Sequence, residues 1–200
     1  MPVDDRRRDG PRVHPTTAAQ WRAWLDGHHA DEPPGVWLVS WRTPTGLPVV
    51  GYEAAIEEAL AYGWIDSTAV RLDDERSAIW FTRRRPGSGW SRSNKERVAR
   101  LEAQGRMAEA GAACVASAQA DGSWTRLDGV EDLVVPRDLA GALDARQGAW
   151  ESWEDFTPSV RRSILAWVAD ARRAPTRSAR VEETARMAAE GQAAHQQRRR

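Results

Sequence analysis

The sequence predicts an α+β fold, with a small, mostly antiparallel sheet and packed helices followed by an all-helical C-terminal module. Three observations predict it. The first half alternates helical apolar spacing with short β-rich runs, and two of those runs flank a short acidic turn. From Pro136 onward every apolar pattern is helical. The chain has 11 Trp against 2 Phe and 2 Tyr, so indoles supply most of the large core surface.

The chain divides into five segments by composition and pattern. We expect a disordered lead (1–15), an α+β body (16–125), a connector (126–135), a helical module (136–190) and a polar tail (191–200).

In the body, Thr17-Ala18-Ala19-Gln20 is a capping box that predicts the start of a helix. Val36–Trp41 is a β-rich apolar run that predicts a central strand. Apolar residues from Tyr52 to Leu60 then repeat at helical spacing until Gly63, which fits a glycine just past a helix end. Trp64–Leu72 and Ala78–Thr82 predict a hairpin around the acidic turn.

Beyond the hairpin, Arg85–Gly89 is a loop, because one Pro and two Gly do not sustain regular structure. Ser93-Asn94-Lys95-Glu96 reads as a capping box with Ser93 as the cap, and Gly105 ends the helix. Ala108–Ala120 is a helix of small residues, which predicts close packing on a neighbouring backbone.

The C-terminal module is expected to contain four helices. Thr157 should cap the third, with Pro158 at its first position. The expected ranges are Arg137–Leu143, Gly148–Phe156, Pro158–Ala171 and Thr176–Glu190.

Composition excludes several classes of protein. No run of about 18 apolar residues is present, so we expect no membrane span. The polar N-terminus lacks the apolar region of a secretory signal, and the single Cys114 fits a reducing compartment, so we expect a cytoplasmic protein. The four His show no metal-ligand spacing, and neither phosphate-binding nor nucleophile-elbow glycine motifs occur. We therefore expect no metal and no cofactor.

The formal net charge is zero, but the charges come in blocks. Glu53–Glu75 and Asp128–Asp155 are acidic, whereas Arg83–Arg106 and Arg161–Arg180 are basic. Two interpretations stay open: the blocks pair with one another in the fold, or Arg83–Arg106 forms a cationic surface for an anionic ligand.

Among the 29 basic residues only Lys95 is a lysine, and its neighbour Asn94 is the only asparagine. An ammonium is a compact point charge, whereas a guanidinium is a planar fork. A lone lysine beside a lone asparagine in an arginine-rich chain therefore indicates either a site that Arg cannot serve or a surface lysine that happened to survive.

Several short motifs follow one another in a fixed order along the chain. They are Gly63–Ser67, Phe81–Lys95, Gly105–Met107, Ala110-Gly111, Asp121–Trp124, Val135–Leu139, Thr157–Ser159 and Pro175–Arg180. These motifs resemble those of the YdeI/OmpD-associated family, also called the bacteriocin-protection or OmdA-type family. One departure is Arg83, where the family pattern has Pro; Arg83 adds a charge and a backbone N–H to the loop.

The resemblance implies an α+β body with a helical C-terminal module, and a link to resistance against bacteriocins, antimicrobial peptides or related stress. It supplies no catalytic residues.

The residues of the central motifs offer hydroxyls, an amide, cations and helix N-terminal N–H groups, which suit an anion. Asp66 is either a base with a raised pKa or an ion-pair partner of Arg84, Arg85 or Lys95. Trp90 either stacks on a ligand or packs in the core. The candidate ligand-binding residues are Trp64, Asp66, Arg84, Arg85, Ser88, Trp90, Ser91, Asn94 and Lys95.

Three functions are compatible with these residues. The favoured one is a non-catalytic protection protein that binds a small anionic molecule, a peptide or a partner protein. The second is an enzyme that uses Asp66 and Lys95 on a phosphorylated or acyl substrate. The third is nucleic-acid binding through Arg83–Arg106, which the neutral net charge disfavours.

Overall fold

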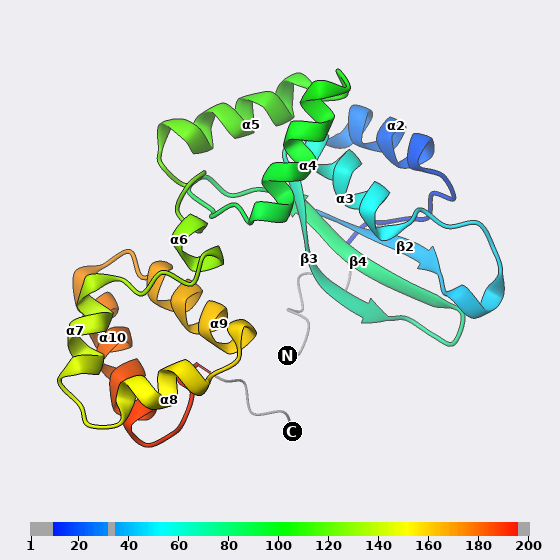
Figure 1. Ribbon diagram of the computed structural model, residues 1–200. Helices are drawn as coiled ribbons and strands as arrows, with labels where there is room; N and C mark the ends of the chain where they lie inside the picture. Colours follow the sequence, from blue (N-terminus) through cyan, green and yellow to red (C-terminus); the bar gives the residue numbers. More distant parts are fainter. Residues whose placement is uncertain (1–9, 32–34, 196–200) are drawn as a thin grey trace. The chain divides into compact units, whose positions relative to one another are not determined.

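The computed structural model describes residues 10–31 and 35–195 and divides them into two compact units (Figure 1). The first, which we call the sheet unit, contains the residues up to Ser88 and Ser93–Trp124. The second, which we call the helical unit, contains Gly89–Arg92 and the residues from Thr125 onward. Most of the predicted disordered lead (1–9) and half of the predicted polar tail (196–200) lie outside the described residues.

The sheet unit is built on four strands in the order β1-β2-β4-β3. They are β1 (Arg12–Val13), β2 (Val36–Trp41), β3 (Trp64–Arg71) and β4 (Arg76–Arg83). Strands β2, β4 and β3 pair antiparallel and β1 joins β2 in parallel, so the predicted small, mostly antiparallel sheet is confirmed. A bulge between Asp66 and Ala69 interrupts the β3–β4 register.

Strand β1 lies in the segment that the sequence predicts to be disordered. Its two residues extend the sheet beside β2, and the Trp37 N–H donates to the Pro11 carbonyl at 2.8 Å. Two residues are too few to show the apolar alternation by which a strand is predicted. Strand β1 is ordered by its pairing with β2 instead.

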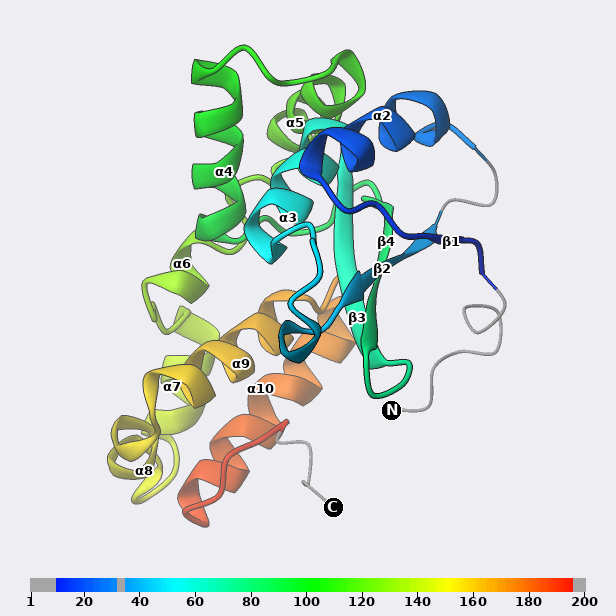
Figure 2. The same cartoon turned by 90° about the vertical axis from the view of Figure 1, so that its right-hand side faces the viewer.

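Helices α2 (Ala18–His28) and α3 (Tyr52–Ala61) pack on one face of this sheet (Figure 2). Thr17 caps α2, and its hydroxyl accepts a hydrogen bond from the Gln20 N–H as the capping box predicts. Trp21 is fully buried against Phe81 of β4, and its indole N–H donates to the Ala55 carbonyl of α3. A buried indole whose N–H is satisfied thus joins α2, α3 and the sheet.

Helices α4 (Arg92–Ala103) and α5 (Glu109–Ala120) complete the sheet unit. Helix α4 begins at Arg92, so the prediction that Ser93 is its cap is wrong: Ser91 precedes the first helical residue and Ser93 lies inside the first turn. The close packing predicted for the small residues of α5 is confirmed at Gly111. A Cβ there would lie 2.2 Å from the carbonyl oxygen of Ala61 in α3.

The helical unit follows the predicted pattern closely. The expected connector contains one short helix, α6 (Asp128–Glu131), and then come α7 (Arg137–Asp144), α8 (Ala149–Asp155), α9 (Pro158–Ala169) and α10 (Ala174–Ala189). Thr157 caps α9 as predicted, with its hydroxyl accepting from the Val160 N–H. The predicted all-helical C-terminal module is therefore confirmed.

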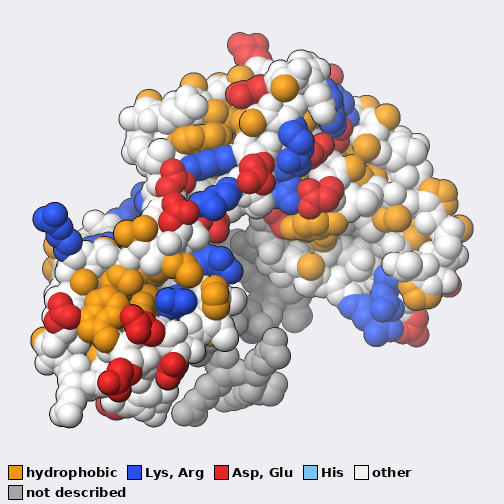
Figure 3. Space-filling view, viewed as in Figure 1, with side chains coloured by type: hydrophobic (Ala, Val, Ile, Leu, Met, Phe, Trp, Pro, Cys, Tyr) orange, Lys and Arg blue, Asp and Glu red, His pale blue; other side chains and the backbone are white. Residues whose placement is uncertain are grey.

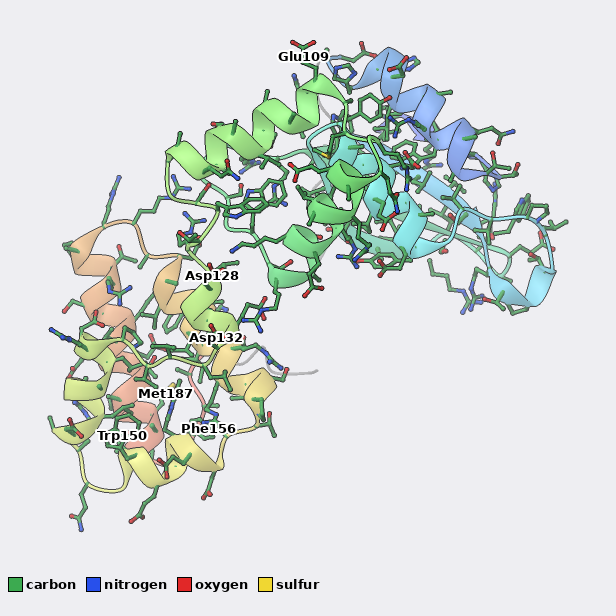
Figure 4. All side chains as sticks on the ribbon, turned by 45° about the horizontal axis from the view of Figure 1, so that its top comes forward. Glu109, Asp128, Asp132, Trp150, Phe156 and Met187 are labelled. Atoms are coloured by element: carbon green, nitrogen blue, oxygen red, sulfur yellow. The ribbon has the colours of Figure 1, made fainter. Side chains whose placement is uncertain are left out.

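The core of the helical unit is aliphatic apart from one indole. Leu139 and Leu143 of α7 and Ile164 of α9 are fully buried, and Trp153 of α8 is 1% exposed. Trp150, in the first turn of α8, packs against this core from its edge (Figure 4). Within the described part of the chain, every helix is too short or too polar to cross a membrane.

Candidate functional site

A tyrosine–carboxylate contact links α3 to β3 in the sheet unit. Tyr52, the first residue of α3, donates its hydroxyl to Asp66 Oδ2 at 3.0 Å. Burial raises the pKa of the Tyr52 phenol, and the hydrogen bond to Asp66 raises it further. The phenol therefore keeps its proton and holds the Asp66 carboxylate in place, although the Tyr52 side chain itself is largely exposed.

Arg97 of α4 connects the lone asparagine to this contact. Its guanidinium donates two hydrogen bonds to Glu53, at 2.7 and 2.9 Å, and a third to the Asn94 amide oxygen at 2.9 Å. The hydrogen bond with Glu53 raises the pKa of Arg97, with further contributions from the nearby Tyr52 and Asp66. Asn94 thus orients the Arg97 guanidinium, which interacts electrostatically with Asp66.

Arg84 extends the cluster from the end of β4. Its backbone N–H donates to the Gly63 carbonyl at 2.9 Å, which fixes the chain directly after the strand. Burial lowers the pKa of the Arg84 guanidinium, and interactions with Cys114 and Asp66 do not fully offset this effect. Burial likewise raises the pKa of the Cys114 thiol, and the charge of Arg84 opposes that shift. Arg84 therefore carries a poorly solvated positive charge.

Lys95 makes a different contact from its neighbour. Its ammonium lies 5.4 Å from the ring centroid of Trp124, in cation–π geometry. The lone lysine and the lone asparagine are adjacent in sequence, but Asn94 serves Arg97 whereas Lys95 covers an indole.

The loop after β4 is closed by its own hydrogen bond. The Ser88 hydroxyl donates to the Arg85 carbonyl at 2.5 Å, and Gly87 adopts a positive φ of 69° that suits a glycine in this turn. The Arg85 side chain is exposed. Ser88 therefore shapes the turn, while Arg85 presents its charge to solvent.

Both candidate tryptophans are packed. Trp64 and Trp90 are each 1% exposed, and the Trp64 indole N–H donates to the His29 carbonyl at 3.1 Å. Of the two interpretations of Trp90, this burial favours packing. Trp90 and Ser91 belong to the helical unit.

The structure thus brings together three of the candidate residues, Asp66, Arg84 and Asn94, and adds residues that sequence reasoning missed. Tyr52, Glu53, Arg97 and Cys114 are the additional members of the cluster. One signal was available for Arg97, since Asn94 and Arg97 are spaced i, i+3 on a predicted helix.

The acidic and basic blocks of the first half pair with each other, as one of the two interpretations predicted. Arg100 pairs with Glu57 at 2.9 Å, and Arg106 pairs with both Glu57 and the buried Glu58. Acidic and basic side chains accordingly alternate over α3 and α4 (Figure 3). Much of the basic block is therefore neutralised by α3.

Two family models match the chain, and between them they cover most of it. The model described as Domain of unknown function (DUF8412) matches residues 13–114, just over half of the chain. The chain belongs to the DUF8412 family. The cluster around Asp66, Arg84 and Arg97 lies entirely within the DUF8412 match, as do the central motifs from Gly63 to Lys95.

The second model, described as Bacteriocin-protection, YdeI or OmpD-Associated, matches residues 132–191. This match confirms the suspected family resemblance and locates it in the helical unit that follows the DUF8412 region. No curated protein and no solved structure matches the chain. Among residues 10–31 and 35–195, no group of three or more His, Cys, Asp or Glu side chains is arranged to hold a metal ion.

Proposed function

We propose that this DUF8412-family chain is a non-catalytic, cytoplasmic binding protein that acts in protection against bacteriocins or related stress, and that it binds an anionic group beside Arg84. The ligand is a small anionic molecule or a peptide carboxylate. The observation that carries the proposal is the half-buried Arg84 guanidinium, whose charge is poorly solvated. An anion that reached it would gain more than at a hydrated surface arginine, because the local dielectric is lower.

The neighbours of Arg84 fit this role. Arg85 adds an exposed cation at the same turn. Asp66 supplies a counter-charge to Arg84 in the free protein, and its carboxylate accepts the Tyr52 hydroxyl. An incoming anion would compete with Asp66 for Arg84, which favours ligands with a strongly localised charge such as a phosphate or a carboxylate.

The contacts of Asp66 and Lys95 favour binding over catalysis. A general base must be able to reach a substrate proton, but Asp66 already accepts the Tyr52 hydroxyl. The Lys95 ammonium lies over the Trp124 ring. Both groups already have partners within the protein, so neither is placed as a free acid, base or nucleophile. These contacts favour the binding proposal over the enzyme alternative.

The ion pairs of α4 argue against nucleic-acid binding through Arg83–Arg106. Arg97, Arg100 and Arg106 donate to Glu53, Glu57 and Glu58, so phosphate contacts would have to break existing pairs.

The test is a titration of 15N-labelled protein with inorganic phosphate and, separately, with N-acetylglycine, observed at the arginine Nε–Hε resonances. We expect a saturable shift of the Arg84 resonance that weakens with added salt. Arg84→Gln should weaken binding by about tenfold, equivalent to about 1.4 kcal/mol. The exposed Arg162→Gln in α9 is the matched control and should bind like the wild type.

Asp66→Asn provides a second variant that does not remove a buried cation. Its amide oxygen can still accept the Tyr52 hydroxyl, while the competing negative charge is lost, so anion affinity should rise. Equal affinity in wild type, Arg84→Gln and Asp66→Asn would refute the proposal.

A further inference from the structure

The helical unit contains a cavity of ≈ 230 Å³ that is separate from the cluster around Arg84. Its walls are mainly apolar. One wall comes from α6 and the segment after it, and the other comes from the C-terminal half of α9. The apolar lining residues are Val130, Val134, Pro136, Leu165, Val168 and Ala169.

Two arginines line the same cavity, but their surroundings differ. Arg177 donates two hydrogen bonds to Asp138, at 2.6 and 3.0 Å, and a third to the Val168 carbonyl at 3.4 Å. Arg126 is half-buried and makes no ion pair with any residue in the described ranges 10–31 and 35–195. The cavity thus combines an apolar interior with one cation, Arg126, that no carboxylate of the described residues neutralises.

The backbone beside the cavity is strained. Leu133 adopts a φ of +56°, a left-handed conformation that is rare for a residue with a branched side chain. The turn is closed by the Val134 N–H, which donates to the Gly129 carbonyl at 2.7 Å. It leaves the Val134 side chain 59% exposed although it lines the cavity. Strain of this kind concentrates at binding sites, and an apolar ligand would cover Val134.

Two of the acidic residues near this cavity are paired with arginines. Asp128 begins α6 and Asp132 follows its last residue, and both are labelled in Figure 4. Asp132 pairs with Arg92 at 2.5 Å, and Asp138 pairs with Arg177. The charges of Asp132 and Asp138 are therefore already engaged in ion pairs.

The volume limits the size of the occupant. A dry cavity of about 150 Å³ accommodates a benzene ring, so ≈ 230 Å³ accommodates a ring with a short substituent. We propose that this cavity binds a small apolar monocarboxylate, with its apolar body against Val130, Leu165 and Val168 and its carboxylate paired with Arg126. This site lies in the helical unit and does not depend on the proposal for Arg84.

Phenylacetate and its neutral analogue phenylacetamide are the probes. Methyl resonances of Val130, Val134, Leu165 and Val168 should shift saturably with phenylacetate, with a Kd of about 1 mM or tighter. Phenylacetamide should bind about tenfold more weakly, because it lacks the charge that Arg126 recognises. Absence of saturable methyl shifts would overturn the proposal.

Three variants assign the parts of the site. Arg126→Gln should weaken phenylacetate about tenfold without changing the affinity for phenylacetamide, whereas Ala169→Leu should fill the cavity and abolish both. Arg162→Gln, an exposed arginine of α9 outside the lining, should leave both affinities unchanged. Phenylacetate binding that is the same in Arg126→Gln and wild type would exclude the assigned carboxylate position, and with it the proposal.

Discussion

The two units of this chain hold their helices together in different ways. In the sheet unit, α5 meets α3 backbone to backbone at Gly111, and the carboxylate of Glu58 is buried between Arg22 and Arg106. In the helical unit an aliphatic core joins the helices, the ion pairs lie nearer the surface, and a cavity remains beside α9. Helices of the sheet unit thus pack in direct backbone contact, whereas the helical unit contains a cavity beside one of its helices.

This difference extends to the ion pairs of the two units. Ion pairs occur in both units, but burial gives them a different energetic weight in each. The Glu58 side chain is 6% exposed, whereas that of Glu182, the partner of Arg146 in the helical unit, is 62% exposed. Removing one partner of a buried ion pair leaves the other charge buried and uncompensated, which destabilises the fold. A surface ion pair contributes little to the free energy of unfolding.

The largest effect is expected from two glycine substitutions that compare helix packing in the units. Gly111→Ala places a Cβ 2.2 Å from the Ala61 carbonyl oxygen, so α3 and α5 must separate, at a cost of about 3 kcal/mol. Gly141→Ala in α7 meets no atom within 4 Å and should stabilise its helix by about 0.5–1 kcal/mol. Amide hydrogen exchange, read separately for α5 and α7, measures both. Similar effects of the two substitutions would contradict the contrast in packing.

Much of this fold was predictable, because local signals determine where most elements begin and end. The threonine caps at Thr17 and Thr157, the glycine at Gly63 and the alternation of the hairpin all act over a few residues. Strand β1 was not predictable, since two residues gain their order only from a neighbouring strand.

The candidate site was predictable only in part, for the same reason. The motifs pointed to Asp66, Arg84 and Asn94, which the structure does bring together. The contacts that join them run through Tyr52 and Arg97, and these depend on how α3, β3 and α4 are placed against one another. The charge blocks indicated that acids and bases would pair, but not which arginine would meet which carboxylate.

A smaller effect is expected at the buried carboxylate of the sheet unit. Glu58→Gln leaves Arg22 and Arg106 with a weaker acceptor and no counter-charge, which should destabilise the unit by about 2 kcal/mol. The value lies below that of a fully buried pair, because each guanidinium is about one third exposed. Urea unfolding at pH 7, combined with hydrogen exchange in α3, measures the loss.

The matched control for that substitution is Glu182→Gln in the helical unit. Its partner Arg146 remains solvated, so the expected loss is below about 0.5 kcal/mol. If Glu182→Gln cost as much as Glu58→Gln, burial would not distinguish the ion pairs of the two units.

The smallest effect concerns the pH dependence of the helical unit. The hydrogen bonds from Arg177 lower the pKa of Asp138 below its usual value, so the unfolded chain binds the proton more readily than the folded one. The resulting stability is fully present above the unfolded pKa of about 3.9 and is lost as the pH falls through the lower folded pKa.

Asp138→Asn should therefore destabilise α7 and α10 by up to about 1 kcal/mol at pH 7, discounted for partial exposure. The difference in free energy of unfolding between wild type and Asp138→Asn should narrow as the pH drops below about 4. The exposed Asp155→Asn is the control and should differ less from wild type at every pH. If the difference in free energy of unfolding between wild type and Asp138→Asn stayed constant from pH 7 to pH 2, Arg177 would not stabilise the folded state through the Asp138 charge.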